Sequence, residues 1–120
     1  MLTFDGTLLG ISNHNQDDGG TSALYYLPAQ GDSLPTMVTK PGVGASYLHG
    51  WSPDNKKMVF TGNRNGAYDI YTIDLDSGKE QQLTNKTTLD DGPEYSPDGE
   101  YIFFNSTRTG KMKLWRMKAN

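Results

Sequence analysis

The sequence predicts an all-β fold made of short antiparallel strands, and three observations lead to this prediction. Seven Tyr, four Phe and two Trp stand among threonines and turn-forming residues in a chain of 120 residues. Aromatic and β-branched residues favour strands, and long runs of helix-forming residues at helical spacing are absent. One segment of the chain also repeats itself, and the period of that repeat predicts how the strands are grouped.

The repeat begins at a tight-turn sequence that occurs twice. The run Trp51-Ser52-Pro53-Asp54-Asn55 recurs as Tyr95-Ser96-Pro97-Asp98-Gly99, and 95 minus 51 gives a period of 44 residues. The same offset aligns Met58-Val59-Phe60 with Ile102-Phe103-Phe104, Arg64 with Arg108 and Ile70-Tyr71 with Leu114-Trp115. A more diverged third copy lies upstream, where Phe4-Asp5-Gly6 aligns with Pro53-Asp54-Asn55 and Leu24-Tyr25 with Ile70-Tyr71.

Each unit is expected to hold four strands. In the middle unit we expect strands near residues 47–51 and at 57–61, 69–74 and 80–84. The corner between the first two is a turn, because Pro53 presets φ and Asp54 accepts a hydrogen bond from a backbone N–H just downstream. We therefore assign a structural role to the residues of the two Ser-Pro-Asp corners, namely Pro53, Asp54, Pro97, Asp98 and Gly99.

A four-stranded sheet that recurs every ~40–45 residues is typical of a β-propeller blade. The chain is then one β-propeller segment over residues 1–120. Its first blade covers about 1–45, its second about 46–89 and its incomplete third about 90–120. Each blade is expected to be a four-stranded antiparallel sheet.

This segment is too short to close a ring by itself. At 44 residues per unit the chain holds about 2.7 units, whereas closed propellers have roughly 4 to 8 blades. We expect a homodimer that completes a six-bladed ring, since an open arc leaves blade faces uncovered, with Leu9, Ile11, Phe103 and Trp115 among the uncovered residues. The alternative is a fragment whose other blades belong to the same polypeptide.

The repeat also carries a family resemblance. Trp51-Ser52-Pro53-Asp54, Phe60-Thr61-Gly62-Asn63-Arg64, Asp69-Ile70-Tyr71 and Leu83-Thr84 together resemble the WD-like repeat of TolB-type β-propellers. The resemblance is weaker in the first copy, where Phe4 replaces the turn proline. It implies six blades and a protein that is outside the cytoplasm or attached to a larger chain. The same blade type resembles the propeller caps of prolyl-oligopeptidase-like peptidases.

Composition excludes several classes of protein. The net charge of −3 argues against general electrostatic binding of nucleic acid. Nothing in the chain resembles the ~18 consecutive apolar residues of a membrane span. The chain has no cysteine, so it has neither disulfides nor thiolate ligands. Residues 1–5 lack the pattern of a secretion signal, so the chain as given is expected to be cytoplasmic, although relatives implied by the resemblance are often periplasmic.

Functional residues are expected at the rim of the propeller, where the loops entering the first strand and those joining the second and third strands meet. We expect Tyr47, His49, Asp90 and Asp91 in the former loops, and His14, Arg64 and Arg108 in the latter. His49 could act as a ligand, a base or a pH sensor, or simply as a polar residue at the channel mouth. A metal site would need His14, Asp90 and Asp91 beside it, and nothing in the spacing requires this, so we assign no metal or cofactor.

The two arginines occupy equivalent repeat positions. Each guanidinium could form a fork with a carboxylate such as Asp90 or Asp91 and join one blade to the next, or it could receive a carboxylate or phosphate of a ligand. Five of the eleven basic residues gather near the end of the chain, with no acid after Glu100. Such an edge serves either to prevent edge-to-edge aggregation or to bind an anionic partner.

No catalytic arrangement is visible. The Gly-x-Ser-x-Gly pattern and a phosphate-binding glycine loop are both absent. We expect a non-catalytic scaffold that binds a protein or peptide through the rim. The alternative is a metal-dependent propeller resembling oligosaccharide lyases, or the propeller cap of a hydrolase.

Overall fold

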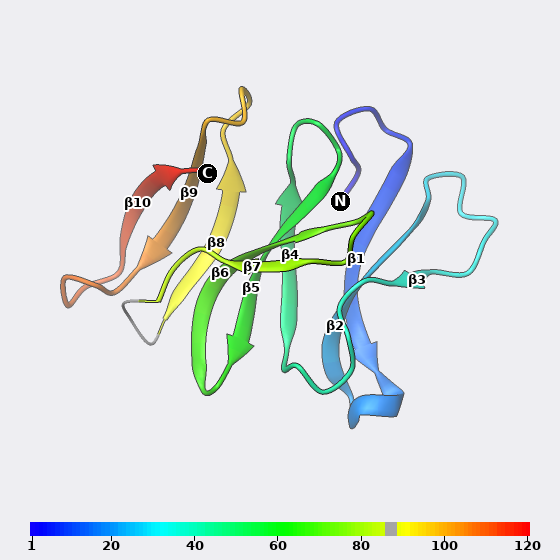
Figure 1. Ribbon diagram of the computed structural model, residues 1–120, viewed down its shortest axis with the longest axis horizontal. Coiled ribbons are helices and arrows are strands. Elements are labelled where there is room, and N and C mark those ends of the chain that lie inside the picture. The colour runs from blue at the N-terminus through cyan, green and yellow to red at the C-terminus, as the bar shows by residue number, and fades with distance from the viewer. Residues whose placement is uncertain (86–88) are drawn as a thin grey trace.

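The computed structural model describes residues 1–85 and 89–120, and these form three antiparallel sheets placed side by side (Figure 1). The first sheet contains β1 (Leu8–Asn15), β2 (Thr21–Pro28) and β3 (Thr36–Met37). The second contains β4 (Ser46–Trp51), β5 (Lys57–Arg64), β6 (Ala67–Asp74) and β7 (Glu80–Gln82). The third contains β8 (Asp90–Tyr95), β9 (Tyr101–Ser106) and β10 (Lys113–Lys118).

Each sheet is a meander in which consecutive strands pair, so the predicted all-β fold is confirmed. Within the described ranges, helical structure is confined to one 3-10 turn, η1 (Gln16–Asp18), which joins β1 to β2. Consequently no helix there could cross a membrane. The middle sheet has the four expected strands, whereas the first and third have three each in the part of the chain that the structure describes.

The corner between the first two strands of a unit has the same geometry in all three copies. In the second copy the Asn55 N–H donates to the Ser52 carbonyl at 2.9 Å, and the Ser52 hydroxyl donates to Asp54 at 2.6 Å. The matching hydroxyl-to-carboxylate bonds, Ser96 to Asp98 and Thr3 to Asp5, are also 2.6 Å long. The corners thus confirm the predicted alignment of the diverged first copy.

These corners set the charge state of their carboxylates. The hydroxyl of Ser96 and the backbone N–H of Glu100 both donate to Asp98 and lower its pKa. Asp54 has its pKa lowered mainly by the Ser52 hydroxyl, against a smaller opposing effect of burial. The last corner position lies in the left-handed region, with φ of 65° at Asn55 and 78° at Gly99, as the turn sequence predicts.

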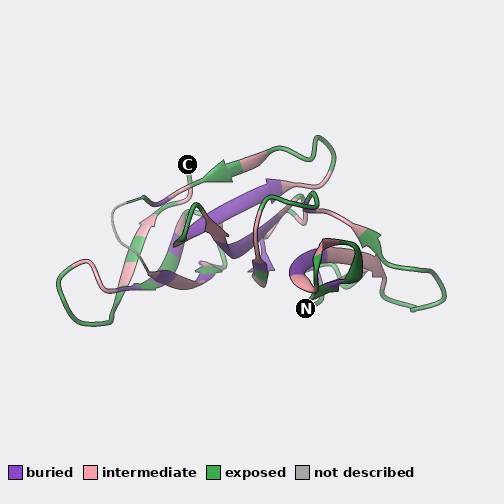
Figure 2. Ribbon diagram, turned by 90° about the horizontal axis from the view of Figure 1, so that it is seen from below, coloured by how far each residue is buried: buried purple, intermediate pink, exposed green. Residues whose placement is uncertain are grey.

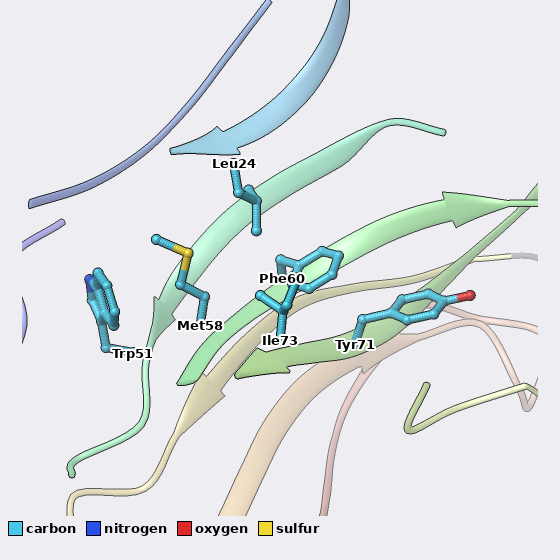
Figure 3. Packing of buried hydrophobic residues seen from close by; sticks show 6 residues of the cluster. All are labelled: Leu24, Trp51, Met58, Phe60, Tyr71 and Ile73. Carbon is cyan, nitrogen blue, oxygen red and sulfur yellow. The ribbon is translucent and has the colours of Figure 1, made fainter. Parts of the chain in front are cut away.

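The core consists of two clusters, one on each face of the middle sheet. Side chains alternate along β5, so Met58 and Phe60 face the first sheet while Val59 faces the third. Figure 3 shows the first cluster, formed by Leu24, Trp51, Met58, Phe60, Tyr71 and Ile73. The second consists of Val59, Ile70, Ile102 and Phe104. Burial is therefore concentrated in the middle sheet, as Figure 2 shows.

One of the residues expected to be uncovered faces the neighbouring sheet instead. Trp115 is half-buried, pairs with the buried Phe104 and packs against the second cluster, so it does not lie on the outer face. The alternation along β10 places its neighbour Leu114 on the outer face, where it is 69% exposed. Phe103 is 37% exposed, as expected, and Leu9 and Ile11 are half-buried.

Candidate functional site

The candidate site lies at the end of the sheets where β5 finishes and β4 begins. Ser46, the first residue of β4, pairs with Gly62 near the end of β5, and Asp90 pairs in the same way with Ser106 of β9. The turns from β1 to β2 and from β5 to β6 point to this same end, in the lower part of Figure 1. We use the word rim for this end of the sheets.

Four of the expected rim residues lie in strands. Tyr47 and His49 belong to β4, which agrees with the strand expected near residues 47–51 but not with a position in the loop before it. Asp90 and Asp91 belong to β8, so their predicted position in a loop between sheets is wrong. Each strand also contains a β-bulge after its first paired residues, between Leu48 and Gly50 and between Asp91 and Glu94. A bulge lets the strand resume its pairing on the far side of an irregular segment that reads as a loop.

The bulge in β4 places His49 outside the regular ladder, with its side chain 35% exposed. Its Nε2 lies 3.4 Å from Oδ1 of Asp91, a carboxylate of the neighbouring sheet whose side chain is 51% exposed. The same Oδ1 accepts a 2.8 Å hydrogen bond from the buried Thr61 hydroxyl of β5. Asp91 therefore joins the third sheet to the second while its side chain stays half exposed.

Tyr47 completes this group from β4. It pairs with Thr61 across the ladder, and it is 41% exposed. An aromatic ring, an imidazole and a carboxylate from two sheets thus gather around Thr61. We call Tyr47, His49 and Asp91 the rim triad.

Arg64 is bound within its own sheet. It forms two hydrogen bonds to the Glu80 carboxylate of β7, from Nη2 at 2.7 Å and from Nε at 3.2 Å. Further bonds run from Nη1 to the Ala45 carbonyl and from Nη2 to the Ser46 hydroxyl, each at 2.9 Å. The expected fork on a carboxylate is present, but the expectation that it joins two blades is wrong.

Arg108 also stays within its sheet. Its Nη2 donates to the Asp90 carboxylate at 3.2 Å, and its Nε donates to the Ser106 hydroxyl at 3.0 Å. Asp90 is fully buried, so the guanidinium provides charge compensation where water does not reach. Both arginines in addition lie over aromatic rings, Arg64 over Tyr71 and Arg108 over Phe104.

A second buried carboxyl lies close to this pair. Burial raises the pKa of Asp69 on β6, and the negative charge of Asp90 raises it further, while the Thr84 hydroxyl lowers it by donating to Asp69 at 3.0 Å. These two carboxyls and Arg108 form a charged group between the second and third sheets.

His14 is separate from the rim triad in its contacts. It lies near the end of β1, where its Nδ1 is 2.6 Å from the Gly20 carbonyl oxygen in the same hairpin. Across residues 1–85 and 89–120, no group of three or more His, Cys, Asp or Glu side chains is arranged to hold a metal ion.

Sequence reasoning missed several residues that shape the rim. Thr84 accepts a hydrogen bond from the Ile70 N–H, and Thr39 does the same for the Leu24 N–H of the first sheet. The recurrence of Val38-Thr39 as Leu83-Thr84 was a signal that could have identified both threonines. Glu80 gave no such signal, since its equivalent position falls outside the third copy.

Gly44 was missed as well. It has a φ of 111°, and a Cβ added there would lie 2.0 Å from the carbonyl oxygen of Asn63. This close approach holds the segment entering β4 against the end of β5, beside the Arg64 guanidinium.

Comparisons with known proteins agree with the fold. Residues 36–120 match the family model described as the TolB beta propeller domain. An uncharacterized protein of Agrobacterium fabrum is 47% identical over 116 residues, which cover 97% of this chain and 38% of that protein. The chain thus spans less than half the length of this curated relative.

Two solved structures are also similar. A putative TolB from Agrobacterium tumefaciens superposes with a TM-score of 0.88 at 46% identity, over 98% of this chain and 40% of that one. TolB from Acinetobacter baumannii superposes with a TM-score of 0.77 at 27% identity, over 98% of this chain and 28% of that one. The three sheets are accordingly propeller blades, and the chain belongs to the TolB β-propeller domain family.

Proposed function

We propose that this chain is a non-catalytic propeller scaffold that binds a protein or peptide segment at its rim. The observation that carries the proposal is the rim triad. Tyr47 and His49 from one blade and Asp91 from the next are all partly exposed and lie around one inter-blade hydrogen bond. Aromatic residues with a polar tip are enriched in protein interfaces, and a carboxylate beside them adds specificity for a basic or hydrogen-bonding group.

The remaining expected rim residues have a supporting part in this proposal. Arg64 and Asp90 are largely or fully buried, so they hold the strands that present the triad. His14 and Arg108 are more accessible and extend the surface toward the neighbouring blades.

To test this proposal, peptides that bind the immobilised chain are selected from a random display library. The affinity of the selected peptides is then measured for the wild-type protein and for variants. Peptides selected on the wild type are expected to bind Tyr47→Ala and His49→Ala at least tenfold more weakly, since the exposed side chains contribute contact without holding the fold. Asp32→Ala, an exposed residue in the loop from β2 to β3, is the control and should bind unchanged. Equal affinity for all four proteins, or no enriched peptide, contradicts the proposal.

We also propose that two copies of the chain complete a six-bladed ring. The chain matches 38% to 40% of the length of its Agrobacterium relatives, so a full ring needs further blades. The outer face of the third blade exposes Leu114 and Phe103, and the outer face of the first blade presents the half-buried Leu9 and Ile11. Apolar faces of this kind are what adjacent blades bury against each other. In the alternative, in which the chain is part of a longer polypeptide, the remaining blades of that polypeptide would cover the same two faces.

Metal analysis of the purified protein tests the enzymatic alternative. The lyase-like hypothesis requires a stoichiometric metal bound through His49, so a His49→Ala variant would lose that metal. Under our proposal neither protein retains a stoichiometric metal after dialysis.

A further inference from the structure

A groove lies between the first and second blades, where the segment from β3 to β4 passes the turn from β6 to β7 (Figure 1). It has a volume of about 270 Å³ and is lined by Lys40, Val43, Ile73, Gly78, Lys79 and Glu80. We call it the inter-blade groove. Sites for drug-sized molecules measure roughly 300–1,000 Å³, so this groove suits a smaller ligand. It shares no residue with the rim triad.

The wall formed by the segment from β3 to β4 is fixed at two points. The Gly42 N–H donates to the Asp18 carboxylate of η1 at 3.0 Å. Gly44 lies so close to the end of β5 that an added Cβ would be 2.0 Å from the carbonyl oxygen of Asn63. These contacts lie on either side of Val43. They therefore hold this part of the groove in place although it has no regular secondary structure.

Part of the lining is apolar. Ile73 belongs to the first core cluster and is 2% exposed, whereas Val43 is 36% exposed. The six lining residues include no aromatic, hydroxyl or amide side chain. A ligand with many hydroxyl groups would lose hydrogen bonds to water here without replacing them, so the groove favours a ligand with an apolar body.

The charges along the groove are compensated unequally. Glu80 receives two hydrogen bonds from Arg64, at 2.7 Å and 3.2 Å, so its negative charge is neutralised within the second sheet. Lys40 and Lys79 are both exposed, and neither forms an ion pair with a residue in the described ranges 1–85 and 89–120. Two uncompensated ammonium groups thus belong to the lining.

Carboxylates of the adjoining turns are hydrogen-bonded elsewhere. Asp74, before the turn from β6 to β7, accepts from the N–H groups of Asp76 and Ser77, both at 2.9 Å. Asp18 accepts from Gly42, as described above. The inter-blade groove is therefore positively charged in a chain whose net charge is −3, and an anion complements it.

We propose that the inter-blade groove binds a small organic anion. Its charged group contacts Lys40 and Lys79, and its short apolar body covers Val43 and Ile73. Lysine offers a point charge and not the planar fork of arginine, so a carboxylate and a phosphate head group both fit this charge. The site is separate from the scaffold role of the rim.

The experiment titrates hexanoate into the whole chain labelled with carbon-13 at the methyl groups of Ile and Val. We expect saturable NMR shifts of the Ile73 and Val43 methyl groups, assigned with Ile73→Val and Val43→Ala. Hexanol has the same apolar body without the charge, and acetate has the charge without that body. Each should bind about tenfold more weakly than hexanoate, because each makes only one of the two contacts. Binding of hexyl phosphate in place of hexanoate would also support the proposal and would identify the head group as phosphate.

Protein variants provide the matched arm. Lys40→Gln and Lys79→Gln should each weaken hexanoate binding severalfold, and the double variant by about tenfold. Lys56→Gln removes the same charge at an exposed corner residue and should bind hexanoate as the wild type does. Circular dichroism verifies that the variants are folded. Unchanged affinity in the double variant would overturn the proposal.

Three further results would also overturn it. The first is equal affinity for hexanoate and hexanol, and the second is a set of shifts confined to other methyl groups, such as that of Ile11. The third is an acidic peptide, acetyl-Glu-Val-Glu-amide, that shifts the Val43 and Ile73 methyl groups when hexanoate does not, since the occupant would then be a protein segment. His49→Ala should bind hexanoate as the wild type does while losing rim-selected peptides, so the two proposals can fail separately.

Discussion

The Thr61 hydroxyl on β5 donates a hydrogen bond to the Asp91 carboxylate on β8, with 2.8 Å between Oγ1 and Oδ1. Thr61 is buried, and its hydroxyl also lies 3.3 Å from the Gly92 N–H at the bulge of β8. One side chain of the middle blade thus holds both the carboxylate and the irregular backbone of the next blade. The position of Asp91 on the rim depends on a residue that no partner can contact directly.

Replacement of Thr61 by valine tests this dependence. Valine keeps the shape and removes the hydroxyl, so we expect the free energy of unfolding to fall by about 1 kcal/mol, the net contribution of one hydrogen bond. Urea denaturation measures the change. Thr109→Val, at an exposed position in the turn from β9 to β10, is the control and should leave the midpoint unchanged. A Thr61→Val protein as stable as the wild type would show that the bond does not hold the blades together.

Replacement of the two arginines by lysine should have unequal effects. Arg64→Lys loses the two-point contact with Glu80 and the bonds to Ala45 and Ser46, so we expect a loss of about 2 kcal/mol. Arg108→Lys keeps one ammonium near the buried Asp90 and should cost less. Equilibrium denaturation of both variants gives the comparison, and a double-mutant cycle with Glu80→Gln isolates the pair. A larger loss for Arg108→Lys would contradict this order.

The corner turns should affect stability without affecting binding. Ser96→Ala removes a hydroxyl that donates to Asp98 and accepts from the Tyr101 N–H at 3.0 Å, so we expect a loss of about 1 kcal/mol. Asp98→Ala should lower the melting temperature in the same direction, while Asp32→Ala serves as the control. Peptides selected on the rim should bind these proteins as they bind the wild type. A loss of binding at unchanged stability would make Asp98 functional.

The same corners make stability depend on pH. Asp5, Asp54 and Asp98 each have a pKa below the ordinary value of 3.8, so the folded chain binds protons less readily than the unfolded chain. Their contribution is fully present above about pH 5 and is lost as the pH falls through 3.8 toward the lower folded values. Urea midpoints measured from pH 6 to pH 2.5 should show this decline. Asp98→Asn should flatten the curve, and an identical slope in that variant would contradict the assignment.

Ring completion by a second copy predicts the mass in solution. The chain has a mass of 13.3 kDa, so size exclusion with light scattering should give a species of twice that value. Leu114→Glu, on the exposed outer face of the third blade, should shift the population toward the monomer without changing the circular dichroism spectrum. A cooperatively melting wild-type species at the monomer mass would refute self-association.

The sequence predicted the fold well because the repeat is encoded by local rules. The Ser-Pro-Asp corner needs only its own residues, so its three copies could be aligned even where Phe4 replaces proline. The strands could be predicted from the aromatic and β-branched runs that recur around Phe60 and Ile102. Local turn chemistry and side-chain period do not depend on distant contacts.

The site was harder to predict, for two physical reasons. The β-bulges at His49 and after Asp91 could not be predicted, because a segment that interrupts the ladder loses the two-residue period. The partner of each arginine depends on which strand supplies a carboxylate, and Glu80 lies on an outer strand, β7, that has no counterpart among the described residues of the third sheet. The sequence also did not show which of the neighbours Leu114 and Trp115 lies on the outer face. This depends on strand register, since a shift of one residue moves every side chain to the opposite face of the sheet.

Among the described residues, the middle sheet alone packs against a sheet on each of its faces, and this asymmetry bears on how these three sheets unfold. In a stack where each unit contacts only its neighbours, the stability of a unit grows with the number of interfaces it shares. The strands β5 and β6 pack against both the first and the third sheet, so they lose both contacts only when all three sheets unfold. The strands β1 and β10 belong to sheets that contact one neighbour each, so they can open once that single contact is lost. Partial unfolding therefore starts at the two ends of the arc, and a neighbour bound at either end would convert a gradual loss of structure into a single cooperative transition.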